Sequence, residues 1–430
     1  MRTSLRSSSD AGQINVGQAS SLSKKRRQAG SLSYIMAFLT TVLSLTACAP
    51  QKQKITVPQD KPLASFQTNL LQTAFDIATA IPVVPHIKDR SKAQAAAATA
   101  CFKLDQPQRA LGYIEKIGDW RRGSGYADYA FYCTQHGFTN DTPHYIKLAE
   151  EISTVADQDW RRDRIKVRIA QTHLILGQTN QMAQFLASLE NSESGKVEQV
   201  EATLCSEEDF DAQMKVLDEL IASRNFDLIK NTLYACAELY DRFYDDTEKR
   251  SQMEDKIRSS WNTLPIFIRI ELLMKLTEIS LQHTDYPKAL ALVNDAKALM
   301  DDAKWRAEFH VPTAARLAAL RFRAGDRDVA RAELLAEEML FNEKQSEILN
   351  MDRADTLIQV AEAFYVMGDS TSSQAIYKQA VETAIENPNS RPCAEDLSAI
   401  CLSMALNKVE PDEALWNRIK EIQSNLGDPW

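Results

Sequence analysis

Residues 118–137, GDWRRGSGYADYAFYCTQHG, are followed forty positions later by residues 158–177, QDWRRDRIKVRIAQTHLILG. The two stretches share the tetrapeptide DWRR, an alanine and a final glycine at equivalent places: Asp119-Trp120-Arg121-Arg122 with Asp159-Trp160-Arg161-Arg162, Ala130 with Ala170, and Gly137 with Gly177. A whole unit therefore recurs. Recurrence at a period of about 20–50 residues is the sequence signature of a repeat architecture.

Each copy of this unit is typical of one helix. Asp119 and Asp159 stand in the place of an N-cap, where a carboxylate can accept the free N–H groups of the first turn. Tryptophan opens the helix, and Gly137 and Gly177 end it. The pattern predicts that DWRR starts a helix and packs it on its neighbour. A doubled ligand site is the other interpretation.

The rest of the chain is helical by pattern as well. Only 13 glycines occur in 430 residues, and alternating runs typical of strands are absent. Apolar residues keep helical spacing, as in Leu272, Leu273, Leu276 and Ile279. The sequence therefore predicts an all-α protein, and the recurring unit favours stacked helix hairpins over a bundle.

Residues 354–388, ADTLIQVAEAFYVMGDSTSSQAIYKQAVETAIENP, resemble a tetratricopeptide repeat. The match falls on Leu357, Ala361 and Phe364 in the first helix, Gly368 in the turn, and Ser373, Tyr377 and Ala380 in the second helix. Partial matches lie at Ala318, Gly325, Ala330, Leu334, Ala289, Val293, Ala296, Ala98, Ala110 and Ile114. Units here lie about 40–43 residues apart, where the family has about 34, and residues 190–265 match poorly. The resemblance implies an α-solenoid, a right-handed superhelix whose concave face holds a peptide or partner helix.

The N-terminus predicts export. Residues 1–30 are polar and basic near their end, and an uncharged, mostly apolar run follows over residues 31–47. Leu45-Thr46-Ala47-Cys48 resembles the bacterial lipobox, in which the cysteine is diacylated and becomes the new N-terminus. We therefore expect a signal peptide over residues 1–47 and lipidation at Cys48. A plain membrane anchor and an ordinary secretory signal are the alternatives, although the apolar run is short for a span.

The net charge of the chain argues against some classes of binding partner. The chain carries 50 basic and 59 acidic residues, a net charge of −9, and loss of the basic signal peptide makes it more acidic. Such a surface repels nucleic acid and anionic headgroups. We expect no nucleic-acid partner and membrane attachment through the N-terminal lipid alone. Ala49 after the cysteine favours the outer membrane, facing the periplasm.

The mature chain divides by pattern into three parts. Residues 48–64 are polar and proline-containing, which is typical of a flexible tether. An N-terminal helical array is expected over residues 65–262, and tetratricopeptide-like repeats over residues 263–430, with a possible break near Leu264-Pro265. The stretch from Asp412 onward is interpreted as a capping helix and tail.

Motifs for chemistry are missing from the sequence. It contains no H-E-x-x-H, no phosphate-binding glycine loop and no G-x-S-x-G, and its histidines show no ligand spacing. We expect no catalytic residue, no metal and no cofactor. The six cysteines after Cys48 permit disulfides in an exported chain, with Cys393/Cys401 and Cys205/Cys236 favoured over metal ligation. Buried free thiols are the other interpretation.

A basic stripe supplies the candidate binding site. Within residues 158–168, QDWRRDRIKVR, Arg161, Arg164 and Arg168 fall within roughly 60° of one another on a helix. The resemblance implies that Arg164 and Gln171 line the concave face, as Ser124 and Phe131 do in the preceding copy. We interpret these residues as binding an acidic or C-terminal carboxylate segment of an envelope protein. The alternative is that the arginines pair with acids of neighbouring repeats, such as Glu150 or Glu151.

These features favour a lipid-anchored scaffold of the bacterial cell envelope that binds a protein or peptide through a repeat groove. The alternative is a helical enzyme or solute-binding lipoprotein that acts on cell-wall peptidoglycan or polysaccharide.

Overall fold

The computed structural model describes residues 57–189, 210–222 and 226–430. All regular structure in these ranges is helical, so the predicted all-α class is confirmed. The predicted signal peptide, Cys48, Cys205 and the first part of the tether lie outside the described residues. The helices are α1 Ser65–Ala80, α2 Val83–Lys103, α3 Pro107–Ile114, α4 Arg121–Gln135, α5 Thr142–Val155, α6 Asp159–Ile175, α7 Thr179–Ala187, α9 Phe210–Ile221, α10 Phe226–Arg242, α11 Thr247–Ser260, α12 Ile266–Gln282, α13 Tyr286–Asp301, α14 Ala307–Arg323, α15 Arg327–Lys344, α16 Asn350–Val366, α17 Ser370–Ala384, α18 Ser390–Leu406 and α19 Glu413–Asn425.

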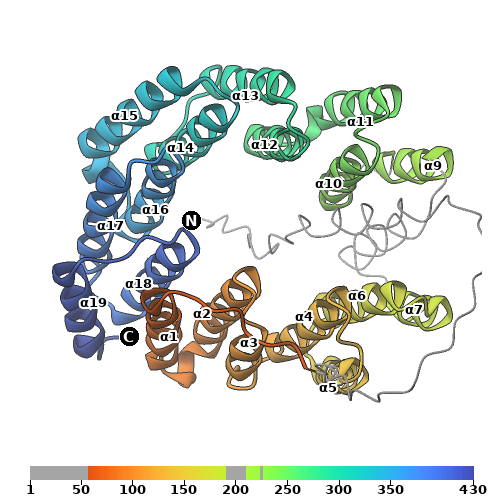
Figure 1. The fold of residues 1–430 in the computed structure, drawn as a ribbon, viewed down its shortest axis with the longest axis horizontal. Coiled ribbons are helices and arrows are strands. Elements are labelled where there is room, and N and C mark those ends of the chain that lie inside the picture. The colour runs from red at the N-terminus through yellow and green to blue at the C-terminus, as the bar shows by residue number, and fades with distance from the viewer. Residues whose placement is uncertain (1–56, 190–209, 223–225) are drawn as a thin grey trace, which may run out of the picture.

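Most helices that follow one another in sequence pack as antiparallel pairs, and neighbouring pairs pack on one another within α1–α7 and within α9–α19 (Figure 1). We call α2, α4, α6, α10, α12, α14, α16 and α18 the inner helices, because they lie on the concave side of a curved array (Figure 1). The outer helices, α3, α5, α7, α11, α13, α15, α17 and α19, cover the convex side. The described chain is thus an α-solenoid of antiparallel helix hairpins, as the sequence predicts.

A recurring turn ends the inner helices. Gly137, Gly177, Gly325 and Gly368 have φ values of +80°, +71°, +103° and +79°, in the left-handed region that glycine adopts without steric cost. The next residue donates its N–H to the carbonyl five positions back, as in the bonds Phe138 to Cys133 (2.8 Å) and Asp369 to Phe364 (3.0 Å). This is the Schellman arrangement of a helix C-terminus. The glycines of the repeating unit therefore end helices, as expected.

The unit that resembles a tetratricopeptide repeat forms one such pair. Its matching residues in α16 and α17 are all buried: Leu357, Ala361, Phe364, Ser373, Tyr377 and Ala380. These positions pack the two helices on each other and on their neighbours. The structure therefore confirms the predicted helix hairpin and its buried residues.

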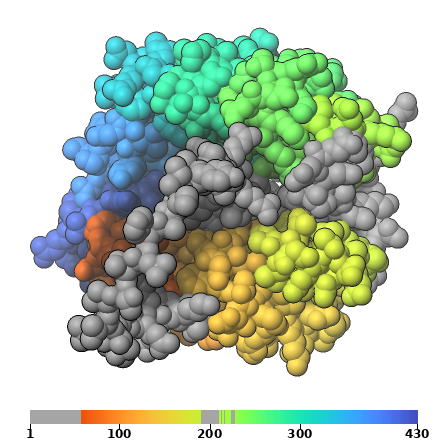
Figure 2. All heavy atoms as spheres, turned by 45° about the vertical axis from the view of Figure 1, so that its right-hand side comes forward, coloured from red at the N-terminus to blue at the C-terminus, as the bar shows by residue number. Residues whose placement is uncertain are grey.

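The first described helix and the C-terminal helices meet in the middle of the array (Figure 1). Helix α1 lies between α18 and α2, and its Leu70, Leu71 and Phe75 are no more than 1% exposed. Gln67 Nε2 donates to the Ala405 carbonyl at 2.9 Å. Figures 1 and 2 show the first helix, in red, directly beside the blue C-terminal helices. The spatial order therefore runs from α9 to α19 and continues with α1 to α7.

The C-terminal helix α19 lies in the outer layer beside α17. Arg418 donates to both carboxylate oxygens of Glu382 at 2.9 and 2.8 Å, and Leu415, Ile419 and Ile422 are buried. The side of α18 that an open-ended solenoid would leave bare is covered by α1 instead.

Buried apolar residues of the described chain form three clusters, one of them within residues 120–169. One cluster joins residues near the N-terminus to residues 311–422. A second includes Met253, Trp261, Leu264 and Ile268, so side chains on both sides of Leu264-Pro265 share one core. The division into two arrays at residue 262 stays a prediction. None of the described helices combines the length and the apolar character needed to cross a membrane.

The favoured Cys393/Cys401 disulfide is wrong. Both residues lie on α18 and both are free and buried, as are Cys101, Cys133 and Cys236. Eight residues along a helix correspond to about 12 Å, whereas a disulfide needs Cα atoms within about 7 Å. Burial raises the pKa of the Cys393 thiol to about 11, which keeps it protonated. The buried free thiol is the interpretation that holds for these residues.

Candidate partner-binding surface

The repeated tetrapeptide sits where α4 packs on α6. The rings of Trp120 and Trp160 meet edge to face with centroids 5.1 Å apart, and Trp120 is 8% exposed. Ala127, Ala130 and Ile165 belong to the same apolar cluster. Edge-to-face contact is a favoured geometry for aromatic pairs. The recurrence at forty residues thus brings two copies of one side chain together across a repeat interface.

The two aspartates of the motif act differently. Asp119 accepts the backbone N–H of Arg121 at 2.9 Å, so it satisfies a first-turn donor of α4 as expected. Asp159 already lies inside α6, after Gln158, and that helix start has no side-chain cap. Asp159 pairs with Arg162 instead. The N-cap residues are Trp120 and Gln158, so the predicted N-cap is wrong in both copies, although the Asp119 carboxylate still accepts a first-turn N–H. The second helix begins two residues earlier relative to the motif than the first.

Glycines after the first tetrapeptide allow the close approach of α4 to its neighbours. A Cβ atom on Gly123 would lie 2.8 Å from Ile152 Cγ2, and one on Gly125 would lie 2.8 Å from Ile114 Cγ1. Contacts this short do not occur between carbon atoms at van der Waals distance. Gly123 therefore allows close packing of α4 on α5 and α6, and Gly125 allows close packing of α4 on α3. The sequence pattern did not reveal either contact.

The arginine stripe of α6 lies along α4. The guanidinium carbons of Arg161 and Arg164 are 5.6 and 5.9 Å from the centre of the Trp120 ring. Arg161 also pairs with Asp157 at 2.6 Å. Cations over an indole face are attracted by its quadrupole. The structure therefore brings two of the three predicted arginines to one aromatic side chain.

Arg168 joins most of the other predicted residues. Its Nε donates to Asp128 of α4 at 2.7 Å, its Nη1 donates to Gln171 at 2.8 Å, and its guanidinium carbon lies 4.6 Å from the centre of the Phe131 ring. The pairing of an arginine with an acid of the neighbouring repeat follows the alternative account, although the acid is Asp128 and not Glu150 or Glu151. Ser124 is half-buried on the same helix. Their role in binding a partner stays a prediction.

A second charged region lies on the inner helices of the C-terminal repeats and was not found from the sequence. Arg316 of α14 donates two parallel hydrogen bonds to Glu271 of α12, at 2.5 and 3.1 Å. Glu362 of α16 accepts from Ser403 of α18 at 2.6 Å. These bonds join positions 45 and 41 residues apart. The signal that could have revealed them is a polar residue recurring at the repeat period within otherwise apolar helices.

Carboxyl groups are crowded at the end of this region. Burial, with the nearby charges of Asp355 and Glu395, raises the pKa of Asp396 from 3.8 to about 8. Its Oδ2 atom is buried without a hydrogen-bond donor in the described part of the chain. Burial also raises the pKa of Glu362, against the hydrogen bond from Ser403. Charge is thus unevenly spread along the inner helices, basic on α6 and acidic on α16 and α18.

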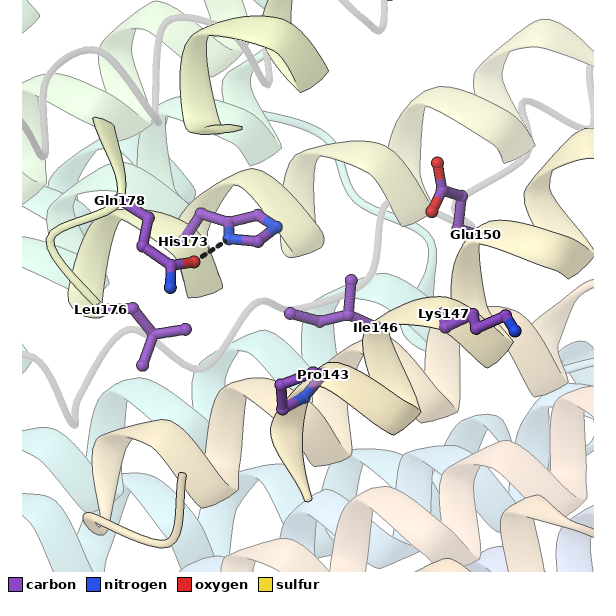
Figure 3. Close-up of a pocket in the computed structure, with 7 residues that line it drawn as sticks. All are labelled: Pro143, Ile146, Lys147, Glu150, His173, Leu176 and Gln178. Atoms are coloured by element: carbon purple, nitrogen blue, oxygen red, sulfur yellow. Dashed lines mark hydrogen bonds between the residues drawn. The ribbon is translucent and has the colours of Figure 1, made fainter. Parts of the chain in front are cut away.

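One shallow depression of about 280 Å³ lies beside α5 and α6 and is lined by Pro143, Ile146, Lys147, Glu150, His173, Leu176 and Gln178. Figure 3 shows that its polar groups are spread out: His173 Nδ1 meets Gln178 Oε1 at 2.7 Å at one end, while Lys147 and Glu150 lie at the other. In the described ranges no group of three or more His, Cys, Asp or Glu side chains is arranged to hold a metal ion.

No protein-family model matches the chain, and no curated protein matches it. The solved structures include a similar chain described as a circular tandem repeat protein with novel repeat topology and enhanced subunit contact surfaces, which is 14% identical, with 84% of this chain and 94% of that chain covered and a TM-score of 0.29.

Proposed function

We propose that this protein is a non-catalytic scaffold of the bacterial cell envelope, anchored by lipid at Cys48, that binds a protein partner along the concave face of a tetratricopeptide-like solenoid. The observation that carries the proposal is the form of the inner surface. Its charged side chains extend over several neighbouring repeats, whereas polar groups in the depression described above do not converge on one point. Extended surfaces of this kind suit elongated protein segments.

The basic part of the surface is assigned to an acidic or C-terminal carboxylate segment of that partner. Arg161, Arg164 and Arg168, with Gln171, Ser124 and Phe131, would form the contact. Arginine binds carboxylates with two parallel hydrogen bonds. Because Arg168 already pairs with Asp128 at 2.7 Å, a partner carboxylate would share or replace that acid.

Charge reversal tests this assignment. The double variant Arg164→Glu/Arg168→Glu should abolish capture of the partner from detergent-solubilised envelopes. Asp128→Asn is the matched control, because it removes the same ion pair and leaves both cations; it should keep the partner. Capture that survives the double reversal, or is lost equally in Asp128→Asn, would return the stripe to a purely structural role.

The choice of face has its own test. A photo-crosslinking residue in place of Glu278, an exposed position on the inner helix α12, should trap the partner, and one in place of Asn294 on the outer helix α13 should not. Crosslinking from Asn294 alone would place the partner on the wrong side of the array. A purified protein that degrades cell-wall material without a partner would favour the enzymatic alternative.

Lipid anchoring is tested at the cysteine itself. Cys48→Ala should move the protein out of the detergent-rich membrane fraction and change its gel mobility. Retention in that fraction with unchanged mobility would replace the lipid with a spanning anchor.

A further inference from the structure

The outer helix α15 has two apolar sides. Its inward side, with Ala330, Leu334 and Phe341, is completely buried against the rest of the array. Its outward side carries Val329, Leu335 and Met339, which are 45%, 52% and 72% exposed. The convex position of α15 is visible in Figure 1. A surface helix normally has charged and polar residues opposite its buried stripe, so α15 departs from the usual pattern.

The exposed residues form a continuous stripe. Val329, Ala332, Ala336 and Met339 follow one another at intervals of three and four residues, which places them on one side of the helix. Both alanines are exposed, and Leu335 lies beside them. Alanines in the middle of the stripe would let another helix approach closely.

This stripe is complementary to itself. When two copies of α15 lie antiparallel, a register exists in which Val329 faces Met339 of the second copy while Ala332 faces Ala336. Arg331 and Glu338 lie on the same edge of the stripe, about 20° apart on the helix. A two-fold axis brings equal edges together, so Arg331 of each copy then faces Glu338 of the other. Self-complementarity of one patch is what a two-fold interface requires.

We infer that the α15 stripe binds a second copy of this chain in a two-fold, antiparallel helix contact. The paired opposite charges beside the stripe favour a second copy over an anionic lipid surface, which would repel Glu338. Arg331 lies over the Phe322 ring, with its guanidinium carbon 5.3 Å from the ring centre. A carboxylate of the second copy can approach the guanidinium from the side that faces away from this ring. The contact uses the convex side and does not depend on the proposed inner-face binding.

The small area that this contact buries predicts a weak dimer. A single pair of helices covers less than the roughly 1,200 Å² at which stable interfaces begin. We therefore expect a dissociation constant of about 10–100 µM, the range of transient interfaces. At membrane-bound concentrations such a contact would still form.

Sedimentation equilibrium of the full-length protein in density-matched detergent measures the dissociation constant of the dimer. Met339→Glu should raise the dissociation constant at least about tenfold, because the two-fold axis buries two unpaired carboxylates. Val155→Glu, at a similarly exposed position (79%) on α5, should leave the dissociation constant unchanged. Circular dichroism should show equal helicity in both, because neither side chain is packed in the core.

A charge swap identifies the register. Arg331→Glu and Glu338→Arg should each weaken the dimer, since each places two like-charge pairs across the axis, and Arg331→Glu/Glu338→Arg should restore it. A wild-type protein that is monomeric up to about 200 µM, a concentration above the whole expected range of the dissociation constant, overturns the inference. So does a dimer that Met339→Glu or the single charge reversals leave intact. Loss of binding to phosphatidylglycerol vesicles by a monomeric Met339→Glu would instead assign the stripe to lipid.

Discussion

Replacing Asp396 by asparagine should stabilise the protein at neutral and alkaline pH and leave it unchanged near pH 4. In the folded chain this carboxyl is held protonated, with a pKa near 8 in place of 3.8, because it is buried and lies near Asp355, Asp352 and Glu395. Asparagine has nearly the same shape and carries no charge. The substitution therefore removes the cost of ionisation and little else.

The magnitude follows from proton binding. Between about pH 4 and pH 8 the folded state keeps a proton on Asp396 that the unfolded state has lost, so the wild-type free energy of unfolding falls as the pH rises. Each unit of pKa difference corresponds to about 1.4 kcal/mol, which gives an upper limit on the order of 5 kcal/mol. Because the side chain keeps some hydration, we expect Asp396→Asn to gain about 2–4 kcal/mol at pH 7.5.

Urea unfolding followed by circular dichroism at pH 4.5, 6.0 and 7.5 measures this gain. The stabilities of wild type and Asp396→Asn should converge at the lowest pH and diverge steadily above it. Asp302→Asn, at an exposed carboxyl after α13, should change stability by less than about 0.5 kcal/mol at every pH. An Asp396→Asn protein that is less stable than wild type at pH 7.5, or equally dependent on pH, would refute the reasoning.

Two further predictions concern packing. Gly123→Ala should destabilise the protein by about 1–3 kcal/mol, because its Cβ would lie 2.8 Å from Ile152 Cγ2. Gly112→Ala, at a helical position with no atom within 4 Å, should stabilise it by about 0.5–1 kcal/mol. Thermal melts that rank the two variants in the opposite order would contradict the packing geometry around Gly123. Truncation before Asp412 removes α19 with its buried Leu415, Ile419 and Ile422, and should lower both solubility and melting temperature. A truncated protein that is monomeric and melts like wild type would show that α19 does not shield an apolar surface of its neighbours.

The candidate surface was only partly predictable. Helical periodicity placed Arg161, Arg164 and Arg168 on one side of a helix. The structure brings them to Trp120, Asp128 and Phe131 of the preceding repeat. The choice of Asp128 over Glu150 depended on how two helices cross, which helical periodicity does not fix. The acidic crowding around Asp396 was missed because its neighbours come from α16 as well as α18.

The sequence by itself determined the helix hairpin, its turn and its repetition. These features depend on interactions within a few residues: apolar spacing along one helix, the bond from the Arg121 N–H to the Asp119 carboxylate, and the left-handed conformation open to Gly137 and Gly368. Only the tertiary structure decided that α1 fills the place between α18 and α2. The bond from Gln67 to Ala405 spans 338 residues, and whether such distant segments meet depends on the small rotation between successive hairpins, summed over the whole array.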